Sequence, residues 1–222
     1  MTLVTISTNT RAFRKERSLF EKALLKAVKG GIKGTSWKMK QNSIFHTRND
    51  TFIEVTIRVS LLKYETEVSI ASKPMSLDPL YWDIVGLEDN KSEPLSFRAW
   101  GAFVCSSLPQ EERVFNDESV GPDEFSKQVI HYVCGRAKDI ESKLSVHSFS
   151  EVVNTHPNQI ERGAYAISLV TSLIDEQKFE QAYSMAEKYV SGDLESCHSH
   201  THGNKGFHEL AIQWLQVNGH IT

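Results

Sequence analysis

The chain has 222 residues, of which 40% are hydrophobic and 24% are charged, and its formal net charge is −3. These values are typical of a soluble globular protein with one domain and room for an appended helical lobe. The weakly negative charge argues against a dedicated nucleic-acid-binding protein. No apolar run reaches the roughly eighteen residues that span a bilayer, and the first residues lack a signal-peptide pattern. We therefore expect a cytoplasmic protein that binds neither nucleic acid nor membrane.

The first segment, residues 10–28, is predicted to be an amphipathic helix. Phe13, Phe20 and Leu24 repeat at helical spacing, and Gly30 follows as a stop signal. Positive charges crowd the first forty residues: Arg11, Arg14, Lys15, Arg17, Lys22, Lys26, Lys29, Lys33, Lys38 and Lys40. We interpret most of them as the solvated side of this helix and of the loop behind it.

Strands are predicted next, and the clearest is residues 53–61, where Ile53, Val55 and Ile57 alternate with polar residues. The other predicted strands are residues 37–40, 43–47, 64–71 and 95–105. A meander of this kind gives a mostly antiparallel sheet. We expect the core to be anchored by Trp82, Phe97, Trp100 and Phe103. The polar stretch 106–120 is predicted to be a loop.

The rest of the chain has helical periodicity, over residues 121–144, 148–154, 160–174, 179–190 and 206–217. The pair 160–174 and 179–190 resembles one tetratricopeptide-type hairpin, but no second copy follows, and a solenoid needs about three repeats. The sequence therefore predicts an α+β protein. A mostly antiparallel sheet covered by an N-terminal amphipathic helix occupies residues 1–146, and an all-helical lobe in residues 147–222 packs on it.

One segment near the C-terminus is rich in zinc-ligating residue types. Cys197, His198, His200 and His202 lie within six residues, and His208 follows. Their alternate spacing matches none of the usual paired ligand motifs. A flexible polar loop without stoichiometric metal is the favoured interpretation, and a metal-dependent enzyme using these residues is the alternative.

Other candidate residues have stronger structural explanations. Cys105 and Cys134 lie in apolar periodic segments, which is typical of buried thiols rather than nucleophiles. Asp78, Asp83 and Arg98 adjoin the aromatic stretch around Trp82. They could line a cleft, but a structural ion pair or helix cap is favoured. Local spacing identifies no catalytic residue, and we expect no cofactor.

A resemblance to an uncharacterised bacterial domain family rests on two stretches, Lys73-Pro-Met-Ser-Leu-Asp-Pro-Leu-Tyr-Trp-Asp-Ile84 and Pro94-Leu-Ser-Phe-Arg-Ala-Trp-Gly-Ala-Phe103. The helical segment from Phe20 to Val28 and the pair Trp37-Lys38 match the opening of that family. The resemblance covers roughly residues 10–145 and implies no catalytic motif. Such domains are similar to small cytosolic proteins encoded beside bacterial toxins, which implies an immunity protein.

The resemblance therefore implies a binding protein whose partner is a protein, such as a cognate toxin. A basic toxin would be attracted by the acidic residues of the predicted loop, and we expect contacts at Glu111, Glu112, Asp117 and Glu118. An ordinary solubilising loop is the simpler interpretation of the same residues. Oligomeric state is left open by the sequence.

Overall fold

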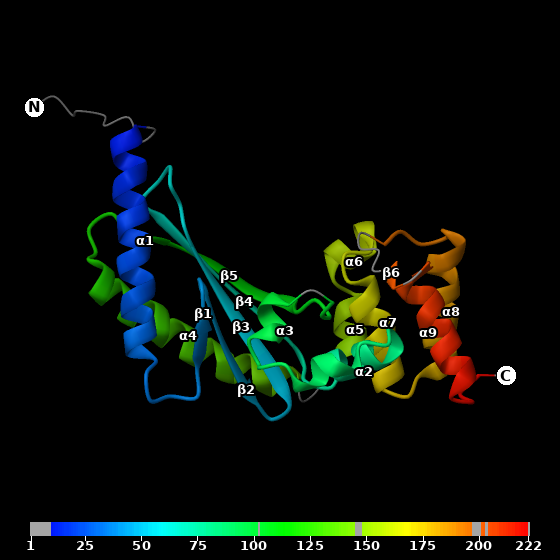
Figure 1. The fold of residues 1–222 in the computed structure, drawn as a ribbon. Coiled ribbons are helices and arrows are strands. Elements are labelled where there is room, and N and C mark those ends of the chain that lie inside the picture. Colours follow the sequence, from blue (N-terminus) through cyan, green and yellow to red (C-terminus); the bar gives the residue numbers. More distant parts are fainter. Residues whose placement is uncertain (1–9, 102, 145–147, 197–200, 203, 222) are drawn as a thin grey trace, which may run out of the picture. The chain divides into compact units, whose positions relative to one another are not determined.

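A computed structural model describes residues 10–101, 103–144, 148–196, 201–202 and 204–221. The chain forms two compact units, each assembled from separated segments. The sheet unit comprises the described parts of Met1–His46, Ile53–Ala71 and Pro109–Ile140. The helical unit comprises those of Thr47–Phe52, Ser72–Leu108 and Glu141–Thr222. The predicted α+β class is confirmed, because an antiparallel sheet, an N-terminal helix and a set of C-terminal helices are all present (Figure 1).

Five strands follow one another across the sheet in sequence order: β1 (Lys38–Lys40), β2 (Ser43–Arg48), β3 (Thr51–Val59), β4 (Glu65–Pro74) and β5 (Leu108–Asn116). β1 and β2 pair antiparallel, with Lys38 opposite Phe45. In β3 the alternating residues Ile53, Val55 and Ile57 are buried. The period-two pattern therefore predicted this strand correctly, and its bounds are displaced by two residues.

Two long helices complete the sheet unit, α1 (Arg11–Gly31) and α4 (Pro122–Leu144), and α4 lies behind the strands in Figure 1. The N–H of Phe13 donates a hydrogen bond of 3.1 Å to Oγ1 of Thr10, which caps α1. The apolar side of α1 faces inward, with Phe13, Leu24 and Val28 buried. A Cβ atom on Gly31 would lie 2.5 Å from Ile130, so this glycine allows α1 and α4 to approach closely.

The helical unit consists of short helices and one small hairpin. They are α2 (Leu77–Ile84), the 3₁₀ helix η1 (Glu88–Ser92), α3 (Phe97–Trp100), α5 (Phe149–Asn154), α6 (Pro157–Arg162), α7 (Ala166–Asp175), α8 (Phe179–Ser191), β6 (Thr201–His202), β7 (Lys205–Gly206) and α9 (Phe207–Val217). Helix α7 is buried along nearly its whole length. Tyr81 of α2 stacks on Phe207 of α9 with ring centroids 5.4 Å apart. Residues 72–108 thus share one apolar core with the C-terminal helices.

The predicted strand at residues 95–105 is wrong, because this stretch forms α3 and an irregular segment. The fifth strand is instead β5, within the stretch 106–120 that was predicted to be a loop. Most β5 side chains are exposed or half-buried, so the strand lacks the alternating apolar pattern that identifies strands in a sequence.

The predicted aromatic core is half correct. Trp82 is only 1% exposed, and its Nε1–H donates a hydrogen bond of 2.6 Å to the carbonyl of Phe103. Phe97 packs against the same core. Trp100 and Phe103, however, are 40% and 39% exposed. The helical turn of α3 replaces the expected strand, so these two side chains do not alternate into a sheet core.

Candidate functional site

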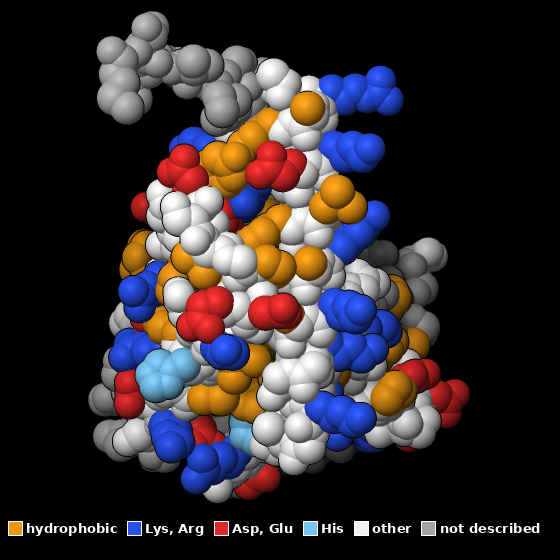
Figure 2. Space-filling model, turned by 90° about the vertical axis from the view of Figure 1, so that its left-hand side faces the viewer, with side chains coloured by type: hydrophobic (Ala, Val, Ile, Leu, Met, Phe, Trp, Pro, Cys, Tyr) orange, Lys and Arg blue, Asp and Glu red, His pale blue; other side chains and the backbone are white. Residues whose placement is uncertain are grey.

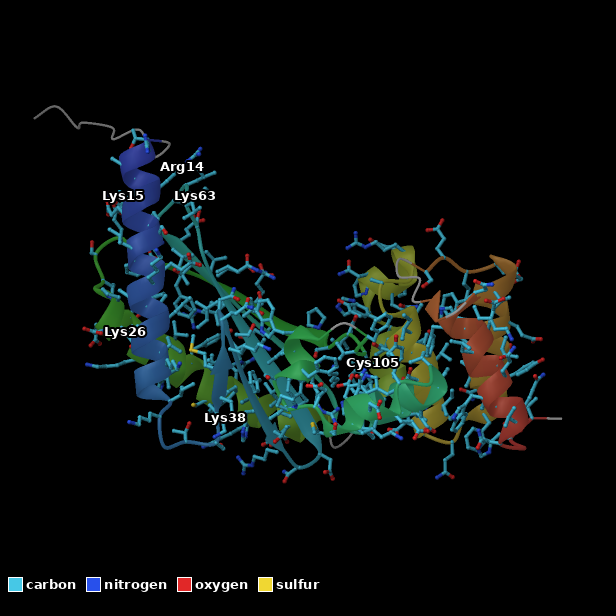
Figure 3. All side chains as sticks on the ribbon, viewed as in Figure 1. Arg14, Lys15, Lys26, Lys38, Lys63 and Cys105 are labelled. Atoms are coloured by element: carbon cyan, nitrogen blue, oxygen red, sulfur yellow. The ribbon has the colours of Figure 1, made fainter. Side chains whose placement is uncertain are left out.

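The most distinctive surface of the sheet unit is the outer side of α1. Five exposed cationic residues lie within about 60° of one another around the helix axis, on the side opposite the buried residues. We call them the basic stripe: Arg11, Lys15, Lys22, Lys26 and Lys29. Figure 2 shows Lys and Arg side chains one above another beside α1, and Figure 3 labels two stripe residues, Lys15 and Lys26. The stripe is about 27 Å long, because a helix rises about 1.5 Å per residue.

The stripe has few local counter-charges. Among the described residues, none of its lysines takes part in an ion pair. The acidic residues of α1, Glu16 and Glu21, lie off the stripe at helical spacing. Its positive field is therefore largely uncompensated on α1 itself.

Charge is also divided unequally between the two units. The segments of the sheet unit contain 16 lysines and arginines and 12 aspartates and glutamates, which gives a formal charge of +4. The segments of the helical unit contain 9 lysines and arginines and 16 aspartates and glutamates, which gives a formal charge of −7. The formal charges of the two units add to the chain's −3. The net charge of the whole chain therefore hides a basic unit and an acidic unit.

The acidic residues predicted to bind a partner do not share one loop. Glu111 and Glu112 lie on β5, where Glu111 accepts hydrogen bonds from Arg136 and, at 2.7 Å, from the hydroxyl of Tyr132. Glu112 and Glu118 are exposed. Asp117 is buried. The expectation of a four-residue acidic surface loop is therefore wrong in its local structure and in the exposure of Asp117.

Asp117 instead fixes α1 to the sheet. Both of its carboxylate oxygens accept hydrogen bonds of 2.7 Å from the guanidinium of Arg17, and the hydroxyl of Thr66 donates a further one of 2.5 Å. Arg17 also donates to the carbonyls of Ser60 and Glu65. This buried ion pair has a structural role, because each of its two charges is matched and hydrogen-bonded within the core.

A second buried charge cluster lies in the helical unit, around Asp78. From the sequence, this residue could either line a cleft or form an ion pair. The carboxylate of Asp78 accepts hydrogen bonds from Lys73 at 2.9 Å, Arg98 at 2.9 Å and the N–H of Cys105 at 2.8 Å. Lys73 donates also to two backbone carbonyls. The ion pair is thus the geometry observed, and it ties α2 to the segment that follows α3.

The remaining candidates from this region also have structural partners. Asp83 accepts hydrogen bonds from Lys91 at 3.1 Å and from Trp214 at 3.2 Å. Burial raises the pKa of Asp83, but the bonds from Lys91 and Trp214 outweigh it and leave the pKa lowered. Burial raises the pKa of the Cys105 thiol to about 12 (Cys105 is labelled in Figure 3). The Cys105 thiol therefore stays protonated and is a poor nucleophile, and Cys134 is half-buried.

One polar cluster was not anticipated from the sequence, because its members are separated by up to thirty residues. The ammonium of Lys178 donates to the hydroxyl of Ser148 at 3.0 Å and to Glu176 at 2.9 Å, and it adjoins Ser150 beside a groove of about 510 Å³. A serine beside a lysine could be a nucleophile with its base. Here the bond to Glu176 raises the pKa of Lys178, so the lysine stays protonated and cannot act as that base.

Glu176 explains why this cluster exists. Its carboxylate accepts hydrogen bonds from the N–H of Ser150 at 2.8 Å and from both serine hydroxyls. A carboxylate at this position caps the N-terminus of α5. The cluster therefore stabilises the contact between α5 and the turn that precedes α8.

The predicted histidine-rich cluster lies mostly outside the described residues. Cys197, His198 and His200 are not described, and His202 belongs to β6 with its side chain outside the described part. His208 is described and stacks on Tyr189, with ring centroids 4.5 Å apart, beside a cavity of about 430 Å³. Neither ring nitrogen of His208 has a hydrogen-bond partner among the described residues.

We expect the stability of the protein to fall between about pH 6.5 and 4 because of His208. Burial lowers its pKa from 6.5 to about 4. In this window the unfolded chain binds a proton that the folded chain does not, so the free energy of unfolding decreases by about 2–3 kcal/mol as the pH falls. Urea unfolding at several pH values should show a flatter profile for His208→Phe. His131→Gln, an exposed control, should keep the wild-type slope, and equal slopes for His208→Phe and the wild type would contradict this assignment.

In the described part of the chain, no group of three or more histidine, cysteine, aspartate or glutamate side chains is arranged to hold a metal ion. None of the helices described is both long and apolar enough to cross a bilayer. No family model, no curated protein and no solved structure matches this chain.

Proposed function

We propose that this chain is a cytoplasmic binding protein that acts by holding a protein partner, and that the partner is a toxin, so that its role is immunity. The observation that carries the proposal is the division of charge into a sheet unit of +4 and a helical unit of −7. Charge separated in this way raises association rates with a complementary partner and disfavours partners of the wrong sign. The toxin class comes from the resemblance at residues 73–84 and 94–103.

The polar clusters support binding rather than turnover. Asp78 is held by three donors, and Glu176 keeps Lys178 protonated. A general base needs a free acceptor near neutral pH and a reacting group within reach. These clusters are occupied by internal hydrogen bonds, so their contribution is to the stability of the fold.

The proposal is tested by co-expression with the product of the neighbouring gene. We expect a complex of defined stoichiometry, and we expect cells that make the neighbouring product to grow only when this chain is also present. A chain carrying Asp78→Ala serves as a control in which folding is damaged. If no partner is recovered and expression protects cells from nothing, the immunity function is wrong.

A further inference from the structure

An exposed apolar side chain borders the basic stripe, about halfway along its length. Leu19 is 57% exposed. It lies four residues after Lys15 and three before Lys22, so it neighbours both on the helix surface. An exposed leucine beside lysines gives this face one apolar contact next to its positive charge.

We propose that the basic stripe, together with Leu19, is the docking face for a protein partner whose own surface is acidic and carries an apolar side chain beside its carboxylates. This inference rests on the proposed function and gives the partner the opposite charge from the one expected from the acidic residues around Glu111. We expect an acidic partner rather than a basic one, because two of the four acidic residues are engaged within the fold. Asp117 is buried and Glu111 is paired with Arg136, whereas the lysines of the stripe face solvent.

Nucleic acid fits this face less well. Single strands are held by aromatic stacking as well as by charge, and both aromatic side chains of α1 are engaged elsewhere. Phe13 is buried, and Phe20 packs against Phe125 with ring centroids 6.1 Å apart. A phosphate backbone would also leave Leu19 without an apolar contact.

A membrane fits less well too. An amphipathic helix binds a bilayer by inserting its apolar side, and the apolar side of α1 is buried in the sheet unit through Phe13, Leu24 and Val28. Leu19 is then the side chain left to insert into a bilayer, and one leucine contributes little apolar area. What α1 presents is a narrow line of charge bordered by one apolar residue, which matches a compact acidic protein surface.

The electrostatic part of this docking is testable with two charge-reversal variants of equal net charge. Lys22→Glu/Lys26→Glu changes the stripe, and Lys127→Glu/Lys138→Glu changes two exposed lysines of α4 in the same unit. All four side chains are exposed, so both variants should keep the wild-type circular dichroism spectrum. The two variants differ in where the charge has been reversed, and the α4 variant also removes the exposed ion pair of Lys127 with Glu124, which is 3.0 Å long.

The probe is a fluorescein-labelled synthetic helical peptide with glutamate and leucine on one face, titrated by anisotropy at low and physiological salt. We expect the stripe variant to bind the peptide roughly tenfold more weakly than wild type, because clustered charge steers association. The α4 variant should bind like wild type, and the loss should shrink at about 0.15 M salt. Leu19→Ala should weaken binding at both salt concentrations.

Each of three results of the peptide titration would overturn the inference. The peptide does not bind the wild-type protein, both charge-reversal variants weaken binding equally, or an oligothymidylate or phosphatidylserine vesicles bind the stripe as tightly as the peptide does. If co-expression recovers a toxin that binds the stripe variant as well as it binds the wild type, the stripe is not the docking face, while the immunity function stands. If co-expression recovers no partner, the immunity function fails and the peptide titration still decides what the stripe binds.

Discussion

Asp117→Ala is expected to lower the free energy of unfolding by about 3–5 kcal/mol, because it leaves the guanidinium of Arg17 buried without its counter-charge. Arg17 and Asp117 are both nearly inaccessible, and the two bonds between them are each 2.7 Å. Urea unfolding followed by circular dichroism measures the loss. The double variant Arg17→Met/Asp117→Leu should recover part of it, because the unpaired charge is then removed together with its partner.

Glu118→Ala is the matched control for Asp117→Ala. Glu118 is the next residue and is exposed, so its truncation should change stability by less than about 0.5 kcal/mol. Comparing the two variants distinguishes a buried carboxylate that stabilises the fold from an exposed one that does not. If Asp117→Ala kept wild-type stability and weakened only partner binding, the buried ion pair would not hold α1 to the sheet.

Trp82→Ala should destabilise the protein by a similar amount, about 3–5 kcal/mol, as is usual for the truncation of a large buried aromatic side chain. Trp82 is 1% exposed and packs near Phe97, with ring centroids 6.0 Å apart. The substitution also removes the donor to the carbonyl of Phe103. Thermal and urea unfolding of the variant measure the loss.

Two further variants divide the effect of Trp82 into its parts. Trp82→Phe keeps most of the apolar contact and loses the indole N–H, so it should cost about 1–2 kcal/mol. Phe103→Ala should cost less than about 1 kcal/mol, because that residue is 39% exposed. A Trp82→Ala protein with a wild-type unfolding midpoint would contradict the central position of this residue.

Local periodicity was sufficient to predict several elements. The inward positions of α1 and β3 follow spacings of 3.6 and 2.0 residues, and those spacings depend only on neighbouring residues. The cap at Thr10 is also local, since its hydroxyl accepts from an N–H three residues later. For such elements the sequence by itself determined both the type of structure and the buried side.

Tertiary structure decided what depends on distant partners. β5 is a strand because a neighbouring strand supplies its hydrogen bonds, although its own side chains carry no alternating pattern. Arg17 and Asp117 are separated by 100 residues, and Ser150 and Glu176 by 26. The spacing of residues along the sequence does not predict pairs at such separations. These pairs are buried only once the chain has folded, and that burial is what gives them their role in stability.

The candidate binding face shows the same division. The sequence alone determined that basic residues crowd the first forty positions and that α1 is amphipathic. Only the fold decided that Arg17 turns inward to Asp117 while Lys15, Lys22 and Lys26 stay in solvent. The reason is that burying a charge is costly unless a partner with matching geometry is present. In the folded chain Asp117 provides that partner for Arg17, whereas the exposed side of α1 leaves its lysines hydrated.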